Sequence, residues 1–248
     1  MRDREIDDIL DQAAQAPHDM APGLLDRVAR SIGPPLVPVR PLPAAWVLES
    51  GLVLICAAVA VGGAARLGLY GIQKLSVWEC ALIFPALGVL IWLAATACVG
   101  ETTPGSRRRV SPGILLGAGS LALVAIFAAL FHDYQTERFV PQGVACLTAG
   151  LLHAIPAGLA AWLLLRRGFA VNAVAAGLAA GTLAGLAGMT MLELHCPNFE
   201  ALHVMVWHTA VIPLSGLAGA LLGWLGHGSG VSAAPTGQDK SNAATGTP

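Results

Sequence analysis

The stretch VWECALIFPALGVLIWLAATAC, residues 77–98, decides the fold class. It is 22 residues long and carries a single charged side chain, Glu79. A helix rises about 1.5 Å per residue, so a run of this length covers the hydrocarbon core of a bilayer, which is about 30 Å thick. A long apolar run with so little charge is typical of a transmembrane helix. We therefore expect residues 77–98 to span a membrane.

Five further apolar runs of similar length lie on either side of this one. The composition also favours a membrane environment, because 55% of the 248 residues are hydrophobic and 12% are charged. Soluble domains carry about twice that share of charged residues. The sequence thus predicts an all-α fold, a bundle of six transmembrane helices. The expected spans are 44–65, 77–98, 113–131, 143–165, 171–192 and 201–225.

These spans divide the chain into three regions: an amino-terminal segment (1–43), the six-span domain (44–226) and a tail (227–248). The tail is rich in Ser, Gly, Thr and Asn, a composition typical of disorder. The amino-terminal segment is polar, and we expect two short helices in it. Their apolar stripes are formed by Ile6, Ile9 and Leu10 and by Leu24, Leu25 and Val28. Helices this short are marginal in water, so we expect the stripes to order by binding a soluble partner.

The distribution of Lys and Arg predicts the orientation of the spans. Of the 14 basic residues, all except Arg66, Lys74 and Arg138 fall on the side that carries both termini. Loops rich in Lys and Arg face the cytoplasm. The sequence therefore predicts a multi-pass protein of the bacterial inner membrane with cytoplasmic amino and carboxyl termini.

Small residues recur at four-residue spacing in the last two spans. Gly177, Gly181 and Gly185 form such a stripe in the fifth span, and Gly219 and Gly223 repeat it in the sixth. Stripes of this kind let helix backbones approach closely. We favour packing within the bundle, and the alternative is an interface between two copies.

Cysteine and histidine residues collect toward the non-cytoplasmic side. Cys146 opens the fourth span, and His153 follows two turns deeper on the same face. Cys196 lies in the connection 193–200, between the fifth and sixth spans. The expected site comprises Cys146, His153, His195, Cys196, His203 and His208.

Three chemistries fit this set of residues. The thiols can switch between dithiol and disulfide beside histidines that favour the thiolate. Thiolates and imidazoles also bind soft or borderline metal ions. Alternatively, His153 and His208 can ligate a haem between helices. The purely structural interpretation is that the cysteines fill space as small apolar side chains and the histidines form hydrogen bonds between helices. The sequence predicts no cofactor, and it leaves open a metal ion at this cluster.

The sequence lacks the motifs that are typical of enzymes and of nucleic-acid-binding proteins. No set of nucleophile, base and acid is visible, and no glycine-rich phosphate loop follows a strand, so we expect no enzyme active site. The net charge of −1 leaves no basic face for a run of phosphates, so we expect no direct contact with nucleic acid. The expected contacts are the lipid bilayer and a soluble protein.

The string Leu194-His195-Cys196-Pro197, followed by His203 and the pair Trp207-His208, resembles a known family. Together with the upstream Cys146 and six spans in matching order, it is similar to bacterial membrane anti-sigma factors of the negative regulator of sigma F type. The resemblance covers residues 44–226. The amino-terminal segment departs from it, being longer and acidic at its start, and it lacks the zinc anti-sigma motif of a His followed by CxxC.

The resemblance implies a regulator that holds an extracytoplasmic-function sigma factor inactive at the inner membrane until oxidative or metal stress arrives. It implies that Cys146 and Cys196 are the sensing pair. The alternative is a small membrane redox protein that cycles thiols against a quinone or carries electrons through haem. The absence of a CxxC pair, the usual arrangement in dithiol catalysts, counts against that alternative.

Overall fold

The computed structural model describes residues 43–102, 110–135, 137–166 and 172–230, and these residues form helices without any strand. The all-α prediction is therefore confirmed. The helices are α3 (Ala45–Leu67), α4 (Val77–Thr102), α5 (Pro112–Leu130), α6 (Phe139–Leu165), α7 (Ala173–His195), α8 (Ala201–His203), the π-helical turn η1 (Val204–His208) and α9 (Thr209–Gly230). The predicted amino-terminal helices, with their six apolar residues, and the tail beyond Gly230 lie outside the described residues.

Within the described ranges, six helices are long and apolar enough to cross a membrane. They are α3, α4, α5, α6, α7 and the continuous segment Ala201–Gly226, which joins α8, η1 and most of α9. The six predicted spans are thus confirmed, with shifted ends.

The largest change that bears on the site is at the end of α7. We placed the end of this span at residue 192, because Glu193 is charged, whereas the helix continues to His195. Glu193 stays in the helix because its carboxylate has a buried partner, described below. Pro197 sets the true end, since the residue before a proline is driven out of the α region, and Cys196 is extended (φ −74°, ψ 121°). At the other end of the chain, α9 runs to Gly230, past the predicted limit of 225.

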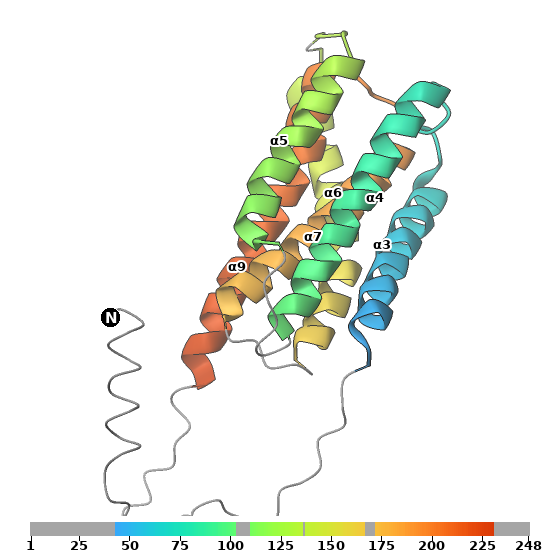
Figure 1. Ribbon diagram of the computed structural model, residues 1–248. Coiled ribbons are helices and arrows are strands. Elements are labelled where there is room, and N and C mark those ends of the chain that lie inside the picture. The colour runs from blue at the N-terminus through green and yellow to red at the C-terminus, as the bar shows by residue number, and fades with distance from the viewer. Residues whose placement is uncertain (1–42, 103–109, 136, 167–171, 231–248) are drawn as a thin grey trace, which may run out of the picture. The chain divides into compact units, whose positions relative to one another are not determined.

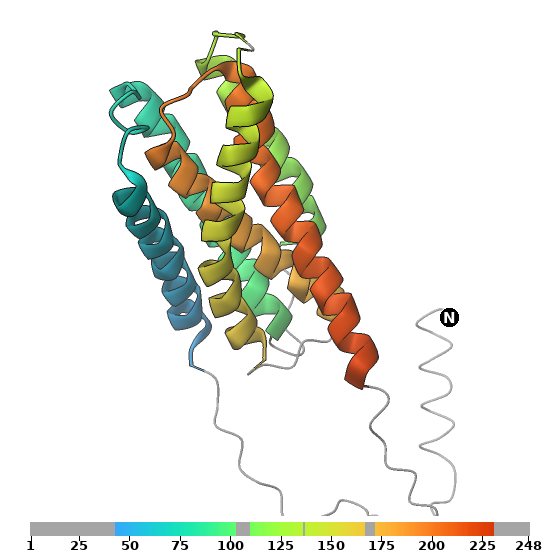
Figure 2. The ribbon, with the colours of Figure 1, turned by 180° about the vertical axis from the view of Figure 1, so that it is seen from behind.

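Helix α7 is the core of the bundle. It packs against α3, α4, α5, α6 and α9, and Figures 1 and 2 show it crossing the bundle obliquely between the other helices. Every residue from 179 to 194 is buried except Thr190. A helix enclosed on all sides by other helices needs small side chains, which explains its glycines and alanines.

The glycine stripes lie between α7 and neighbouring helices of the same chain. Gly177 meets the backbone of Gly219, and Gly181 meets the backbone of Ser215, both in α9. Gly188 faces the backbone of Gly150 in α6. A Cβ atom at any of these three α7 positions would overlap main-chain atoms of the facing helix. The structure therefore assigns the stripes to packing within the bundle, the interpretation favoured from the sequence.

The outer surface of the bundle is strongly apolar. Large side chains such as Leu54, Leu121 and Leu222 are about 70% exposed (69%, 70% and 70%). In water so much exposed apolar surface would drive association, whereas lipid tails solvate it. The surface thus agrees with six helices that cross a bilayer.

Successive helices run in opposite directions, so the connections alternate between the two ends of the bundle (Figure 1). Three connections, 68–76, 131–138 and 196–200, share one end, which we call the loop end. The first residues of α3 and the last residues of α9 lie at the opposite end. The cysteines and histidines expected to form the site are on helices and connections that reach the loop end.

The close approach of α7 and α9 makes Gly181 a sensitive position. We expect Gly181→Ala to lower the stability of the protein by about 1–3 kcal/mol, because the new methyl group meets the carbonyl oxygen of Ser215. The matched control is Gly117→Ala in α5, where nothing lies within 4 Å of the added carbon. The control should leave stability unchanged or raise it by up to about 1 kcal/mol, since alanine favours helix. Thermal unfolding of the detergent-solubilised protein measures both, and an equal effect at the two sites would contradict the packing.

Candidate functional site

The turn after α7 fixes the position of Cys196. Because Pro197 forces Cys196 out of the helix, the thiol leaves the axis of α7. The backbone N–H of Cys196 still donates to the carbonyl of Leu192 at 2.7 Å. The side chain is buried, with 4% of its surface exposed. Cys196 is thus held at the loop end by the last turn of the most buried helix in the described part of the chain.

The connection 196–200 is itself tied down at several points. Asn198 Nδ2 donates to Gln142 Oε1 of α6 at 2.8 Å. The ring of Phe199 stacks on Phe131 at the end of α5, with 5.2 Å between centroids. The backbone N–H of Ala201 donates to the carbonyl of Asp133 at 2.6 Å. These contacts join α5, α6 and α7 around the cysteine.

Cys146, in the second turn of α6, faces Cys196. The two sulfur atoms lie 3.4 Å apart and form a thiol hydrogen bond. Both thiols are free, so the structure describes a reduced pair. The approach of these two residues, expected from their shared place at the loop end, is present.

A π-helical turn brings His203 and His208 to the same side. In an α-helix, residues five apart point about 140° away from each other, because each residue turns the helix by about 100°. Here the N–H of Thr209 donates to the carbonyl of Val204, five residues back, and the wider turn aligns positions five apart. The imidazole rings lie 5.2 Å apart in a T-shaped arrangement, and both are fully buried.

Proline explains where this wide turn occurs. Pro213, inside α9, has no N–H to donate to the carbonyl of Thr209, and its ring crowds that carbonyl. Thr209 is the residue that closes the π turn. The helix thus departs from regular α geometry where the proline already interrupts its hydrogen bonds.

Glu193 is the buried partner of His208. His208 Nδ1 and Glu193 Oε1 lie 2.8 Å apart, and both side chains are 0% exposed. A carboxylate oxygen accepts hydrogen bonds, so His208 Nδ1 is taken as the donor in this pair. The other ring nitrogen, His208 Nε2, is buried and has no hydrogen-bond partner among the described residues. The pairing leaves one nitrogen of a fixed imidazole available at the thiols.

Four side chains therefore converge. One donor atom from each of Cys146, Cys196, His203 and His208 lies within 4.8 Å of the others. His203 Nε2 is 3.8 Å from Cys196 Sγ. The hydrogen bond with Cys146 and burial together raise the pKa of Cys196 above its ordinary value, so this thiol stays protonated at neutral pH unless a ligand displaces the proton. The arrangement suits either thiol chemistry or metal binding.

Two of the expected site residues lie elsewhere. His195 Nδ1 is 2.8 Å from the carbonyl oxygen of Gly68, at the end of α3, and its ring packs near Tyr70. His153 Nδ1 is 2.8 Å from the carbonyl oxygen of Ala149 in its own helix, and the ring lies against Gly63 of α3. Both histidines link α3 to its neighbours. The pair needed for haem ligation is thus not assembled, because His153 faces α3 while His208 is bound to Glu193.

Glu193 is the residue of the site that our sequence analysis missed. We had placed it in a connection, as the charge that ends a span. The sequence did contain an indication that Glu193 belongs to the site, because a carboxylate flanked by Leu192 and Leu194 in an apolar helix is energetically costly unless it has a partner. The partner lies 15 residues away, behind a turn and a π bulge.

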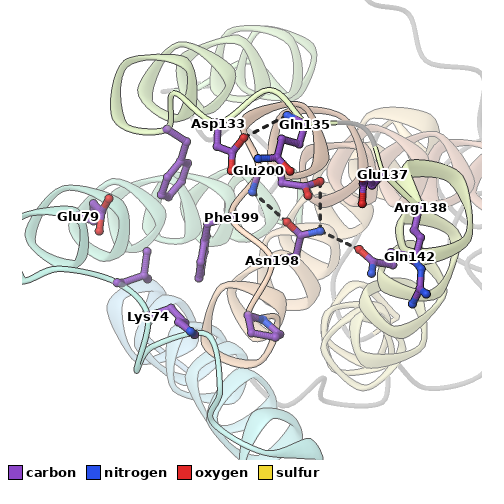
Figure 3. Close-up of a pocket in the computed structure, with 13 residues that line it drawn as sticks. Lys74, Glu79, Asp133, Gln135, Glu137, Arg138, Gln142, Asn198, Phe199 and Glu200 are labelled. Carbon is purple, nitrogen blue, oxygen red and sulfur yellow. Dashed lines mark hydrogen bonds between the residues drawn. The ribbon is translucent and has the colours of Figure 1, made fainter.

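A polar pocket of about 600 Å³ lies at the loop end beside this cluster. Figure 3 shows its lining, which includes Asn198 with its hydrogen bonds to Gln142 and Glu200. Gln142 precedes Cys146 by one helical turn, and the lining residue Pro197 follows Cys196 directly. The charged residues of the lining are Lys74, Glu79, Asp133, Glu137, Arg138 and Glu200. The pocket is thus lined by residues close in sequence to the two cysteines.

A comparison with protein families identifies the chain. The family described as negative regulator of sigma F matches residues 33–225, which include the first five spans, the sixth up to residue 225 and the Cys/His cluster. The chain belongs to this family. No curated protein and no solved structure matches the chain. The resemblance read from the His-Cys-Pro string is therefore confirmed, and the chain is a member of a family of sigma-factor regulators.

Proposed function

We propose that this protein is an inner-membrane anti-sigma factor that sequesters an extracytoplasmic-function sigma factor and responds to oxidative or metal stress through Cys146 and Cys196. Membership in the negative regulator of sigma F family supports the regulatory role. The observation that carries the sensing role is the reduced thiol pair, with sulfur atoms 3.4 Å apart. A pair this close forms a disulfide or binds a soft metal ion with small movements.

The proposed topology places the thiols outside and the partner inside. In this topology both termini lie on the side that holds 11 of the 14 basic residues, the side expected to face the cytoplasm. The thiol pair is at the loop end, on the opposite side of the bundle from the start of α3 and the end of α9. A stress signal would therefore reach the cysteines without crossing the membrane.

The partner-binding role falls to residues 1–43. The apolar stripes of Ile6, Ile9 and Leu10 and of Leu24, Leu25 and Val28 suit a groove on a soluble protein. Acidic residues on the opposite face of the first helix, such as Asp7, Asp8 and Asp11, suit a basic surface of the kind that binds nucleic acid. A sigma factor offers both features, and the acidity disfavours binding of this helix to the negative cytoplasmic leaflet.

The topology can be tested with reporters that fold only in the cytoplasm. A fluorescent reporter fused after Pro248 should be bright, and the same reporter fused to a chain truncated after Glu200 should be dark. A reporter active only in the periplasm should give the opposite pattern at the two sites. The reverse result with both reporters would refute the orientation and the external position of the cysteines.

The sensing role predicts a specific loss in cysteine variants. Cys146→Ser and Cys196→Ser should keep repressing the sigma-dependent promoter, while induction by a thiol oxidant or by cadmium should be abolished. The reason is that a serine hydroxyl neither forms a disulfide nor binds a soft cation well. Cys80→Ser, which alters a partly exposed cysteine outside the cluster, is the matched control and should respond normally. Normal induction of the two site variants would exclude these thiols as sensors.

Variants of the amino-terminal segment should have the opposite phenotype, namely expression of the sigma-dependent genes without stress. Replacing both Ile6 and Leu10 by Asp should release the sigma factor and switch on its genes without stress, because two charges would be forced into an apolar groove. Co-purification with the sigma factor should be lost as well. In the control variant, Ala233 and Ala234 in the tail are both replaced by Asp, and this variant should repress normally. If the Ile6/Leu10 variant and a chain lacking residues 1–43 both repress fully, this segment is not the binding surface.

A further inference from the structure

The four side chains that converge at the loop end also meet the requirements of a metal centre. We propose that Cys146, Cys196, His203 and His208 form a tetrahedral site for a divalent cation of the zinc type, with Glu193 orienting His208. The inference rests on the proposed function in one respect, since it names the class of ligand that the sensing thiols take. Binding of the ion can be measured without any assay of repression.

Two of the separations among the four donor atoms are close to tetrahedral values, and all of them are within 4.8 Å. Bonds of about 2.3 Å to sulfur and about 2.0–2.1 Å to nitrogen place two sulfur ligands about 3.8 Å apart and a sulfur and a nitrogen about 3.6 Å apart. The observed separations are 3.4 Å between Cys146 Sγ and Cys196 Sγ and 3.8 Å between Cys196 Sγ and His203 Nε2. Shifts of a few tenths of an ångström thus convert the thiol pair and His203 into ligands.

The hydrogen bonding of His208 is the strongest indication that this side chain binds a metal ion. Metal-bound histidines commonly donate the second ring N–H to a carboxylate, which fixes the tautomer and directs the free nitrogen at the metal. The buried hydrogen bond between His208 Nδ1 and Glu193 Oε1 provides this arrangement. His208 Nε2 is then left buried without a hydrogen-bond partner among the described residues, on the side of the thiols. A bound cation would satisfy this nitrogen.

The charge of the donor set suits a buried divalent ion. On binding, each thiol loses its proton, each sulfur forms a bond to the metal and His208 Nε2 must be unprotonated, so at least two protons leave for one ion. The two thiolates cancel the two positive charges, and the two imidazoles are neutral ligands. Three of the four ligands are buried, and a set of four ligands that neutralises the ion avoids most of the cost of burying its charge.

The fourth ligand, Cys146, lies on the helix that borders the polar pocket. Cys146 is only partly buried, and the polar pocket borders its helix at Gln142 (Figure 3). Carboxylates outnumber cationic side chains in the lining of this pocket. A negative pocket raises the local concentration of cations at the site.

Cobalt(II) tests the proposal, because it replaces zinc and its absorption spectrum reports ligand type and geometry. The full-length protein in detergent is reduced, stripped with a chelator and titrated with Co²⁺. We expect one Co²⁺ per chain, visible bands of tetrahedral geometry and a near-ultraviolet band from thiolate ligands. Zn²⁺ should abolish these bands at one equivalent. Absence of the thiolate and tetrahedral bands in the wild-type protein overturns the proposal.

Variants separate the ligands from their neighbours. Cys196→Ser and His208→Gln should lose the tetrahedral spectrum, whereas the matched controls Cys80→Ser and His153→Gln should keep it. Glu193→Gln should keep the spectrum and bind Zn²⁺ about 10–100-fold more weakly, the usual effect of altering a residue that orients a ligand. A spectrum unchanged in a chain lacking both Cys146 and Cys196 would place the metal elsewhere and refute the site. If a ligand variant fails to fold, the wild-type spectrum and the Glu193→Gln affinity decide.

The outcomes also distinguish this inference from the proposed function. A protein that represses the sigma factor and responds through its thiols, yet binds no Co²⁺, overturns the metal site alone. A protein that binds Co²⁺ at these four residues, yet neither represses nor retains a sigma factor, overturns the regulatory role alone.

Discussion

The hydrogen bond between Glu193 and His208 is the interaction on which the rest of the loop end depends. Both side chains are fully buried in a bundle whose outer surface is apolar, so neither can turn to water for a partner. Removing one member of such a pair leaves an uncompensated polar or charged group, at a cost of about 3–5 kcal/mol. The pair therefore fixes the rotation of α7 relative to the start of the last span. It also explains why α7 continues through a charged residue as far as His195.

Because α7 lies at the centre of the bundle, it links the Glu193–His208 pair to the other helices. Its buried stretch, 179–194, connects the loop end to the crossing with α9, where glycines bring the two backbones into direct contact. Cys146 belongs to α6, which meets the same helix through Gly150 and Gly188. Interfaces formed by backbone against backbone leave little room for adjustment. A change in spacing between Cys146 and Cys196 would therefore shift α6 against α7 as a whole.

Hydropathy and motif spacing predicted most of the architecture, because both are properties of the sequence alone. The six spans, the packing of the glycine stripes and the approach of Cys146 to Cys196 could be read in advance. The misplaced end of α7 came from treating Glu193 as a terminating charge, a judgement that needed knowledge of its partner. The roles of His153 and His195 could not be predicted from the sequence for a similar reason. Both face α3, and the sequence does not contain the angle at which α7 crosses the bundle. The π turn at Val204–His208 was the least visible feature, although Pro213 gave a local hint.

The spacing of the thiols bears on how the proposed site would respond to an oxidant and to a metal ion. A disulfide needs its sulfur atoms about 2.05 Å apart, whereas two thiolates on a tetrahedral zinc lie about 3.8 Å apart. The reduced pair, at 3.4 Å, lies between these values. Oxidation would therefore draw Cys146 toward Cys196 by about 1.4 Å, and a metal ion would separate them by about 0.4 Å. The same sulfur atoms cannot do both at once, so an oxidant and a cation compete for the site. Since Cys196 is held by the turn at Pro197 and by α7, the movement would fall mainly on α6, the helix that carries the more exposed thiol. Under the proposed function, either shift would move α6 against α7, and the two shifts are opposite in direction.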